Sequence, residues 1–317
     1  MMGTYIRRRL VSLVVVVFLA SVIVFSLIRL LPGDPAQAIA GDTATPEQVE
    51  AIRKNLGLDR SIVVQYGLWI GRAIRGDFGQ SFVNGITVSE LIGQRLPATL
   101  QLAVAGLILA LVFGVATGVA AGLRSNGVVD RIVSALNVVA LGVPSFSLGL
   151  ILLIVFGLKL HWMPLSGYES LLEDPGSALR HLTLPAVTLG FLLMPPISLL
   201  VRDGILAQLE QDHVRTATAM GLPRATIIRA NLLRNAFIPV LTMLGLITGN
   251  LLSGAVVVEV VFSWPGLGSL ALGAVLGSDF PTVQAIVLLA VMAFVLVNLL
   301  TDLLHAKLDP RVLKDGV

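Results

Sequence analysis

Stretches without charged side chains dominate this chain, and the polar residues gather between them. A helix rises about 1.5 Å per residue, so roughly 20 apolar residues cross a hydrocarbon core of about 30 Å. Six charge-free stretches are long enough, or nearly so: residues 10–28, 96–123, 132–158, 181–201, 235–258 and 280–301. The pattern predicts an all-α integral membrane protein with six transmembrane helices. Residues 260–278 are also free of charge, but Trp264-Pro265-Gly266 and further glycines favour a re-entrant or interfacial loop there.

Composition agrees with a lipid environment. Charged residues make up 13% of the chain, against roughly 25% in soluble domains, and the mean hydropathy is +0.90. The absence of cysteine excludes disulfides, thiolate metal sites and thiol nucleophiles. Three arginines precede the first apolar run and imitate a secretory signal, but the run is longer than the core of about 7 to 15 residues typical of such signals. It is therefore predicted to be a retained helix.

The basic residues indicate an orientation. A cytoplasmic N-terminus places most of them inside, as the positive-inside rule requires: Arg7, Arg8, Arg9, Arg124, Arg131, Arg202, Arg215, Arg224, Arg229, Arg234, Lys307, Arg311 and Lys314. The two short loops on the other side hold Lys159 and Arg180. Both termini are therefore predicted to be cytoplasmic. The net charge of +3 then records topology, and no basic patch with interleaved aromatic residues suggests nucleic-acid binding.

The long polar segment between the first two runs is predicted to be helical. Thr45 followed by proline is typical of a helix start, and residues 62–75 form an amphipathic pattern with Tyr66 and Trp69 on one face. Thr87 and Glu90 have the spacing of a capping box just before the second run. We expect a small helical segment on the extracytoplasmic side.

Catalytic and ion-coupling chemistry find little support. The four histidines lack metal-ligand spacing, and no Gly-x-x-x-x-Gly-Lys-Ser/Thr phosphate loop occurs. A secondary transporter predicts a charge near mid-membrane, and an intramembrane enzyme predicts paired catalytic groups at one depth. Neither pattern is present, so both classes remain minor alternatives.

Small and polar residues within the runs suggest how the helices pack. Glycines or serine recur at four-residue spacing, which allows close helix contact within the chain or, alternatively, with a second subunit: Gly114, Gly118, Gly122, and Gly245, Gly249, Ser253. Uncharged polar residues are predicted to form interhelical hydrogen bonds or to line a hydrated path: Gln101, Asn137, Ser145, Asn250, Ser253 and Asn298. Prolines inside runs invite kinks or helix boundaries: Pro144, Pro195 and Pro196.

The polar loop at residues 202–234 is the most informative stretch. Residues 212–223 read as a short helix that Gly221 ends as C-terminal cap, with Pro223 following. A second helix is predicted over residues 224–237. A short amphipathic helix on the cytoplasmic face can dock in a groove of a soluble partner.

This loop resembles the EAA loop of permease subunits of ABC importers, in the version of the oligopeptide/dipeptide/nickel permease family. The matching residues are Arg215-Thr216-Ala217, Gly221 and Leu233-Arg234-Asn235-Ala236-Phe237-Ile238-Pro239. Departures from the general motif at Arg215, Asn231 and Arg234 are shared with the peptide branch. Further stretches resemble the first, B-type permease of that family along nearly the whole chain: Leu31-Pro32-Gly33-Asp34-Pro35, Gly76-Asp77-Phe78-Gly79, Glu259-Val260-Val261-Phe262, Trp264-Pro265-Gly266-Leu267-Gly268 and Leu308-Asp309-Pro310-Arg311.

The resemblance implies a type I ABC importer permease fold in the bacterial cytoplasmic membrane. It implies a non-catalytic chain that pairs with a second permease, two ATPase subunits and an extracytoplasmic substrate-binding protein. ATP and magnesium would bind the partner subunits, and this chain would hold no cofactor. Di- or oligopeptides are the expected substrates, with nickel chelates, glutathione or another small solute as alternatives. The expected division is residues 1–31 with the first span, 32–95 extracytoplasmic, 96–304 as transmembrane core with a coupling loop at 202–235, and a tail at 305–317.

Three groups of site residues follow from the resemblance. The first is a coupling helix for the ATPase: Asp212, Val214, Arg215, Thr216, Ala217, Met220, Gly221 and Leu222. The second lines the translocation path: Ser145, Asn250 and Ser253. The third contacts the binding protein: Trp69, Glu259 and Trp264.

Overall fold

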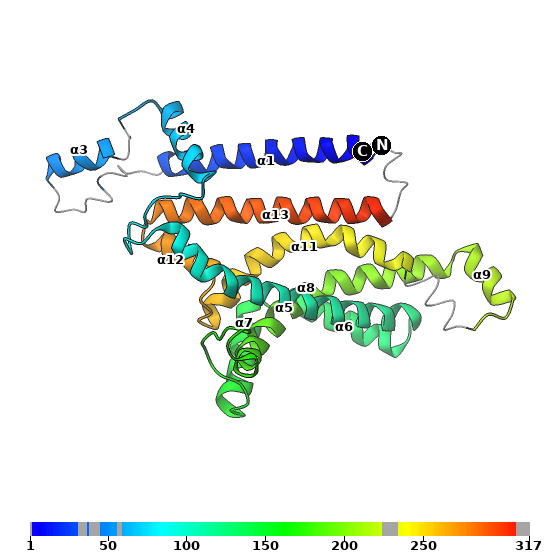
Figure 1. Ribbon diagram of the computed structural model, residues 1–317. Coiled ribbons are helices and arrows are strands. Elements are labelled where there is room, and N and C mark those ends of the chain that lie inside the picture. Colours follow the sequence, from blue (N-terminus) through cyan, green and yellow to red (C-terminus); the bar gives the residue numbers. More distant parts are fainter. Residues whose placement is uncertain (1, 31–36, 38–44, 56–58, 224–233, 309–317) are drawn as a thin grey trace. The chain divides into compact units, whose positions relative to one another are not determined.

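The chain is helical throughout the part that the computed structural model describes, which is residues 2–30, 37, 45–55, 59–223 and 234–308 (Figure 1). The elements are α1 (Met2–Leu30), α3 (Pro46–Asn55), α4 (Ile62–Ala73), α5 (Val88–Leu123), α6 (Val128–Gly142), α7 (Ser145–Leu152), the π-helix η1 (Leu153–Lys159), α8 (Pro175–Leu209), α9 (Asp212–Ala219), α11 (Arg234–Val261), α12 (Leu267–Leu276) and α13 (Phe280–Leu308). Extended pairing in these residues is confined to one bridge between Gln80 and Thr87. The prediction of an all-α protein is confirmed.

Four helical segments are long and apolar enough to cross a membrane: Arg7–Ser26, Val88–Leu123, Pro175–Leu209 and Phe280–Leu304. Helix α6 and the α7–η1 pair make a fifth if counted together, although they are bent by 104°. The predicted span over residues 132–158 is therefore broken at Pro144, where the sequence predicted a kink or a helix boundary. Val143 and Pro144 leave helical geometry, with ψ of 121° and 139°, because proline disfavours helical geometry in the residue before it. The fifth predicted span, residues 235–258, lies within α11.

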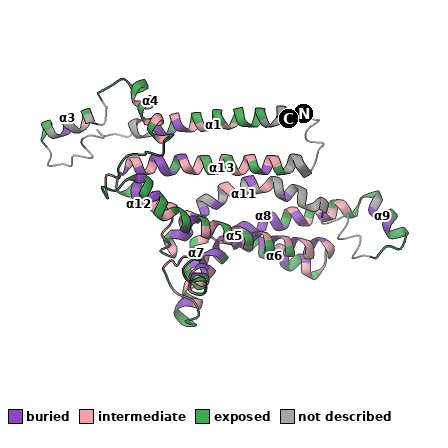
Figure 2. Ribbon diagram, in the orientation of Figure 1, coloured by how far each residue is buried: buried purple, intermediate pink, exposed green. Residues whose placement is uncertain are grey.

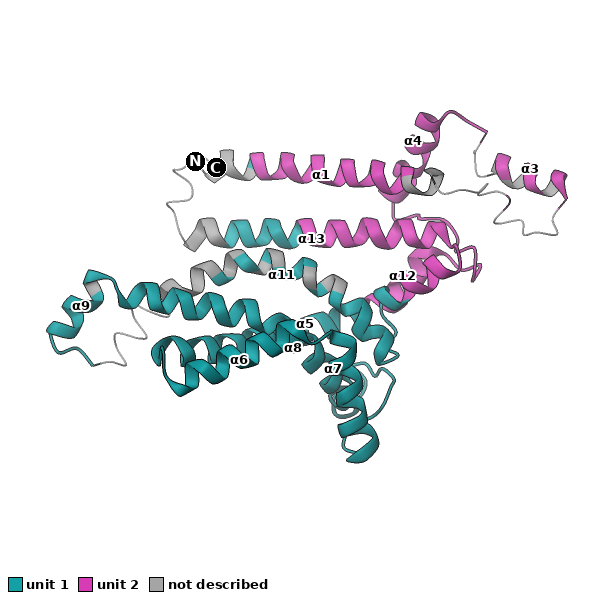
Figure 3. Ribbon diagram, turned by 180° about the vertical axis from the view of Figure 1, so that it is seen from behind, with its two compact units in different colours: residues 1–7, 97–269, 296–317 teal, residues 8–96, 270–295 magenta. Residues whose placement is uncertain are grey.

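The chain divides into two compact units (Figure 3). The first holds residues 1–7, 97–269 and 296–317, and the second holds residues 8–96 and 270–295. One boundary lies between Leu96 and Pro97, close to the expected end of the extracytoplasmic segment. The division into functional segments stays a prediction.

Helix α8 forms the centre of the first unit. Asp174 caps its first turn by accepting hydrogen bonds from the backbone N–H groups of Gly176 and Ser177, at 3.0 and 3.1 Å. The helix runs through Pro195 and Pro196 without ending, so neither proline forms the boundary that proline can impose. In the most apolar stretch of 18 residues in α8, 67% is buried, compared with 17% in the corresponding stretch of α1 (Figure 2). Helices α6, α7 and α11 pack against it.

The glycine stripe of α5 lets this helix approach α8 closely. A Cβ atom placed on Gly114 would lie 2.8 Å from Cβ of Ile197, and one on Gly118 would lie 2.5 Å from the backbone oxygen of Ser198. The stripe therefore packs within the chain, as predicted, and leaves no room there for a second subunit. Gly245 of the second stripe lies against the side chain of Asn298 on α13.

Substituting Gly118 with alanine is expected to lower stability by about 1 to 3 kcal/mol, because the new methyl group meets backbone that cannot rotate away. The matched control is Gly93→Ala in the same helix, where a Cβ atom meets nothing within 4 Å. That change is expected to be neutral or to stabilise by about 0.5 to 1 kcal/mol. The check is the temperature at which each detergent-solubilised variant aggregates. Equal shifts for the two variants would contradict the close packing.

Capping side chains define the helix starts of the second unit. The backbone N–H of Glu90 donates to Oγ1 of Thr87 at 3.4 Å, which places the start of α5 where the sequence predicted it. Asp279 stands before α13 and accepts from Oγ1 of Thr282 at 2.7 Å. It also accepts from the backbone N–H of Phe82 at 3.0 Å and from the hydroxyl of Ser81. One buried carboxylate thus links the first turn of α13 to the turn that precedes α5.

Candidate functional site

Helix α9 is the short helix that the sequence predicted in the polar loop. It begins at Asp212 and ends at Ala219. The backbone N–H of Leu222 donates to the oxygen of Ala217 at 3.2 Å, and that of Gly221 donates to the oxygen of Thr218 at 3.0 Å. Gly221 has φ of +75°, a left-handed conformation that costs glycine little. This pair of bonds is a Schellman motif, so α9 ends abruptly and can act as a rigid body. The predicted second helix begins in residues 224–233, outside the described residues.

Helix α9 has a buried face, and exposed apolar side chains follow its last residue. Val214 and Ala217 are buried, with 5% and 7% exposed, and they pack against Leu123 at the end of α5. Met220 is 76% exposed and Leu222 is 46% exposed. The remaining candidates also reach the surface: Asp212, Arg215 and Thr216 on α9, and Gly221 just after it. Val214 and Ala217 therefore hold α9 on α5, while Met220 and Leu222, which follow the last residue of α9, leave apolar area exposed.

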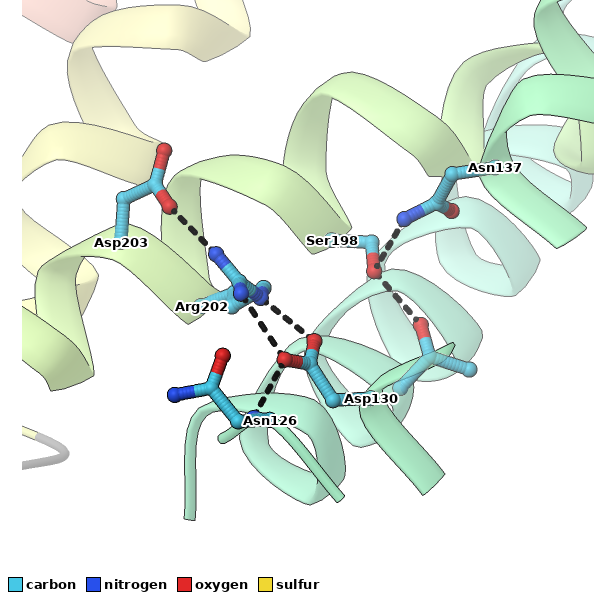
Figure 4. Close-up of polar contacts among 7 residues, drawn as sticks. Asn126, Asp130, Asn137, Ser198, Arg202 and Asp203 are labelled. Atoms are coloured by element: carbon cyan, nitrogen blue, oxygen red, sulfur yellow. Dashed lines mark hydrogen bonds and ion pairs between the residues drawn. The ribbon is translucent and has the colours of Figure 1, made fainter. Parts of the chain in front are cut away.

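An ion pair joins α6 to α8 (Figure 4). Arg202 on α8 donates from Nε to Oδ1 of Asp130 at 2.7 Å and from Nη2 to Oδ2 at 2.9 Å. The backbone N–H of Asn126 donates to the same carboxylate at 2.9 Å, and Asp203 accepts from Nη1 of Arg202 at 3.2 Å. The two-pronged geometry fixes orientation as well as distance. The sequence gives no signal for this pair, because the two residues are separated by 72 positions and each reads as an ordinary interfacial charge.

The hydroxyl of Ser198, one turn before Arg202 on α8, joins three helices (Figure 4). Ser198 is fully buried, and its Oγ accepts from Nδ2 of Asn137 on α6 at 3.1 Å and from Oγ1 of Thr117 on α5 at 3.0 Å. For Asn137, the predicted interhelical hydrogen bond is confirmed. Together with the ion pair, this contact ties α5, α6 and α8 into one body beside α9.

Glu259 and Trp264 form a second buried network near the end of α11. Glu259 is 0% exposed, and its carboxylate accepts from Oγ1 of Thr99 and from the backbone N–H of Ser269, both at 2.8 Å. Trp264 is 1% exposed, and its Nε1 donates to the oxygen of Ala98 at 2.9 Å. Gly266 lies directly against the carboxylate, where a Cβ atom would overlap it. These contacts fold the loop between α11 and α12 back onto α5.

The resemblance implied that Glu259 and Trp264 contact an extracytoplasmic binding protein. Both side chains are buried in this structure, and the carboxylate of Glu259 satisfies the turn. The contact with a binding protein stays a prediction. Trp69 is partly exposed and packs on Phe25 and Tyr66.

The predicted path residues are only partly visible. Ser145 is partly exposed and is the first residue of α7, at the bend after Pro144. The side chains of Asn250 and Ser253 lie outside the described residues. Their role stays a prediction.

Comparison with known proteins gives the class. Residues 111–314 match the model of the binding-protein-dependent transport system inner membrane component, and residues 1–103 match the model of its N-terminal part. The chain is 39% identical over 311 residues to the probable peptide ABC transporter permease protein y4tP of Sinorhizobium fredii (strain NBRC 101917 / NGR234), covering 98% of this chain and 99% of that protein. It is 38% identical over 311 residues to the glutathione transport system permease protein GsiC of Escherichia coli (strain K12), with the same coverage.

A solved structure supports the fold. The crystal structure of an amino acid ABC transporter with histidines aligns at a TM-score of 0.51 and 19% identity, over 69% of this chain and 94% of that chain. The chain is thus a multi-pass permease of an ABC transport system in the bacterial inner membrane. It belongs to the family of binding-protein-dependent transport system inner membrane components, in the dipeptide/oligopeptide-type branch.

Proposed function

We propose that this permease forms, with a second permease, the path by which di- and oligopeptides enter the cell. The observation that carries the proposal is the near full-length similarity to a probable peptide permease and to a glutathione permease, since glutathione is itself a small peptide. Two ATPase subunits bind ATP and magnesium, a binding protein delivers the substrate, and this chain catalyses no reaction. Six spans with both termini in the cytoplasm complete the arrangement.

The geometry of α9 supports a mechanical link to the ATPase. The Schellman motif makes the helix rigid, and Val214 and Ala217 fix it on α5. Two residues separate α9 from α8, which carries the ion pair to α6. A displacement of α9 would therefore move α8, and with it the body made by α5, α6 and α8. Met220 and Leu222 are the side chains that would bury apolar area in an ATPase groove.

The coupling proposal is tested with aspartate at the exposed apolar positions. We expect Met220→Asp and Leu222→Asp each to weaken ATPase copurification and ATP-dependent uptake about tenfold, since a charge placed in an apolar contact costs about 1 to 3 kcal/mol. Leu172→Asp is the matched control, because Leu172 is 96% exposed in the loop before α8. Unchanged ATPase binding and uptake in both test variants, with normal membrane levels, would contradict a coupling role for α9.

The substrate is tested separately in vesicles that contain the assembled transporter and its binding protein. We expect ATP-dependent uptake of a labelled dipeptide, tripeptide or glutathione and none of a nickel chelate. Uptake of the nickel chelate alone would overturn the peptide assignment and leave the coupling role of α9 intact.

A further inference from the structure

Helix α4 carries an aliphatic surface that the described part of the chain leaves uncovered (Figure 2). None of its 12 residues is buried. Val63 is 75% exposed and Ile74, just after the helix, is 80% exposed; three further exposed aliphatic side chains are Ile62, Val64 and Leu68. Burying such a side chain gains about 1.5 to 3 kcal/mol, so this much apolar surface on one short helix indicates a nonpolar environment.

Opposite sides of α4 differ in polarity. At 100° per residue, Val63 and Ile74 fall on one flank, while Gln65 and Arg72 fall on the opposite flank. Tyr66, between these flanks, contacts α1. Val63 and Ile74 therefore mark an aliphatic flank. The exposed Val64 and Leu68 lie between the two flanks, on the side away from Tyr66.

The contact with α1 sets the depth of α4 (Figure 1). The hydroxyls of Tyr66 and Ser21 are 2.7 Å apart, and the ring of Phe25 lies 5.3 Å from that of Tyr66 and 5.6 Å from that of Trp69. The charge-free run at the start of the chain ends at Ile28, just before Arg29. Ser21 precedes that end by about 10 Å along the helix axis. Helix α4 thus leans on the last turns of a membrane span, at the level where acyl chains meet headgroups.

We propose that α4 is an interfacial helix, with its aliphatic flank in the acyl chains of the leaflet at the C-terminal end of α1. Lipid is the occupant that fits, because α1, on which α4 leans, is long and apolar enough to span a membrane and exposes aliphatic side chains on opposite sides: Val14 is 63% exposed and Ile23 is 58% exposed. Exposed arginines lie at both ends of α4 and suit anionic headgroups: Arg60, Arg72 and Arg75. Tyr66 and Trp69 are the amphipathic rings that gather at membrane interfaces. The inference needs no assumption about the transported substrate.

Site-directed spin labelling of the full transporter tests this, since the chain has no native cysteine. Nitroxides are attached to Val63→Cys and Ile74→Cys on the aliphatic flank, and to Gln65→Cys and Arg72→Cys on the polar flank. The protein is reconstituted in vesicles of phosphatidylethanolamine and phosphatidylglycerol. Val15→Cys on α1 is the lipid reference and Leu172→Cys is the aqueous reference, being 48% and 96% exposed in the structure.

The readout is the collision rate with oxygen, which partitions into lipid, relative to that with nickel-EDDA, which stays in water. We expect this ratio to be at least about threefold higher at positions 63 and 74 than at 65 and 72, and close to that at position 15. Ratios at 63 and 74 like that at position 172 would place α4 in water and overturn the proposal. Shielding of 63 and 74 from both reagents, whether constant or induced by the binding protein, would show a protein occupant and would overturn it as well.

Discussion

Replacing Glu259 with alanine is expected to destabilise the permease by about 3 kcal/mol or more. The carboxylate accepts from Thr99 and from the backbone of Ser269, and each donor left unpaired in the interior costs about 1 to 3 kcal/mol. Removing the side chain also leaves a cavity between Gly266 and Gly268, both of which pack against it. The loop that holds Trp264 should then loosen on α5, because Glu259 orients the Thr99 hydroxyl, which also accepts from the backbone N–H of Leu267 at 2.7 Å.

The measurement is thermal inactivation of the detergent-solubilised protein, read together with the intrinsic fluorescence of Trp264 and the other two tryptophans. Glu259→Gln keeps the shape and one acceptor oxygen, so it should cost much less than the alanine. Glu173→Ala is the matched control, because Glu173 is exposed in the loop before α8. If the Glu259 and Glu173 alanine variants lose equal stability, the carboxylate does not anchor the loop.

The sequence predicts the helices well because lipid leaves few options for the backbone. Scarcity of charge marks the spans, and local capping chemistry marks their starts, as Thr87 shows for α5. Gly221 likewise ends α9 at the predicted place, since its left-handed conformation depends on local sequence alone. The 104° bend after α6 also has a local signal in Pro144, but its size depends on how α7 packs against α8 and α11.

The sequence does not predict which polar side chains meet. The pattern around Glu259 and Trp264 predicts a re-entrant or interfacial loop, but it does not show that the fold buries both side chains against α5. Ser198 sits within an apolar run and gave no signal, although it joins three helices. Val214 and Ala217 belong to the expected coupling helix, but the position of Leu123 decides that they face inward. Each of these outcomes depends on partners distant in the sequence, which periodicity cannot supply.

Breaking the ion pair between Asp130 and Arg202 is the second change with a large expected effect. Removing one partner of a buried pair costs about 3 to 5 kcal/mol, because the other charge stays desolvated. The side chain of Arg202 is 24% exposed and that of Asp130 7%, so water compensates in part. We therefore expect Arg202→Ala or Asp130→Ala to lose about 2 to 3 kcal/mol. Arg202→Lys keeps the positive charge but should recover only part of this loss, because an ammonium cannot reproduce the two bonds from Nε and Nη2.

A double-mutant cycle separates this contact from a simple loss of packing. If the pair acts as a unit, the variant with both alanines should be barely less stable than either single variant. Asp203→Ala is the matched control, since Asp203 is 68% exposed and its bond to Arg202 contributes at most about 1 kcal/mol. Uptake should fall together with stability in the two single variants, because α8 would then move without carrying α6. Additive losses in the cycle, or equal losses for Asp203→Ala and Asp130→Ala, would show that the two helices are held together by other contacts.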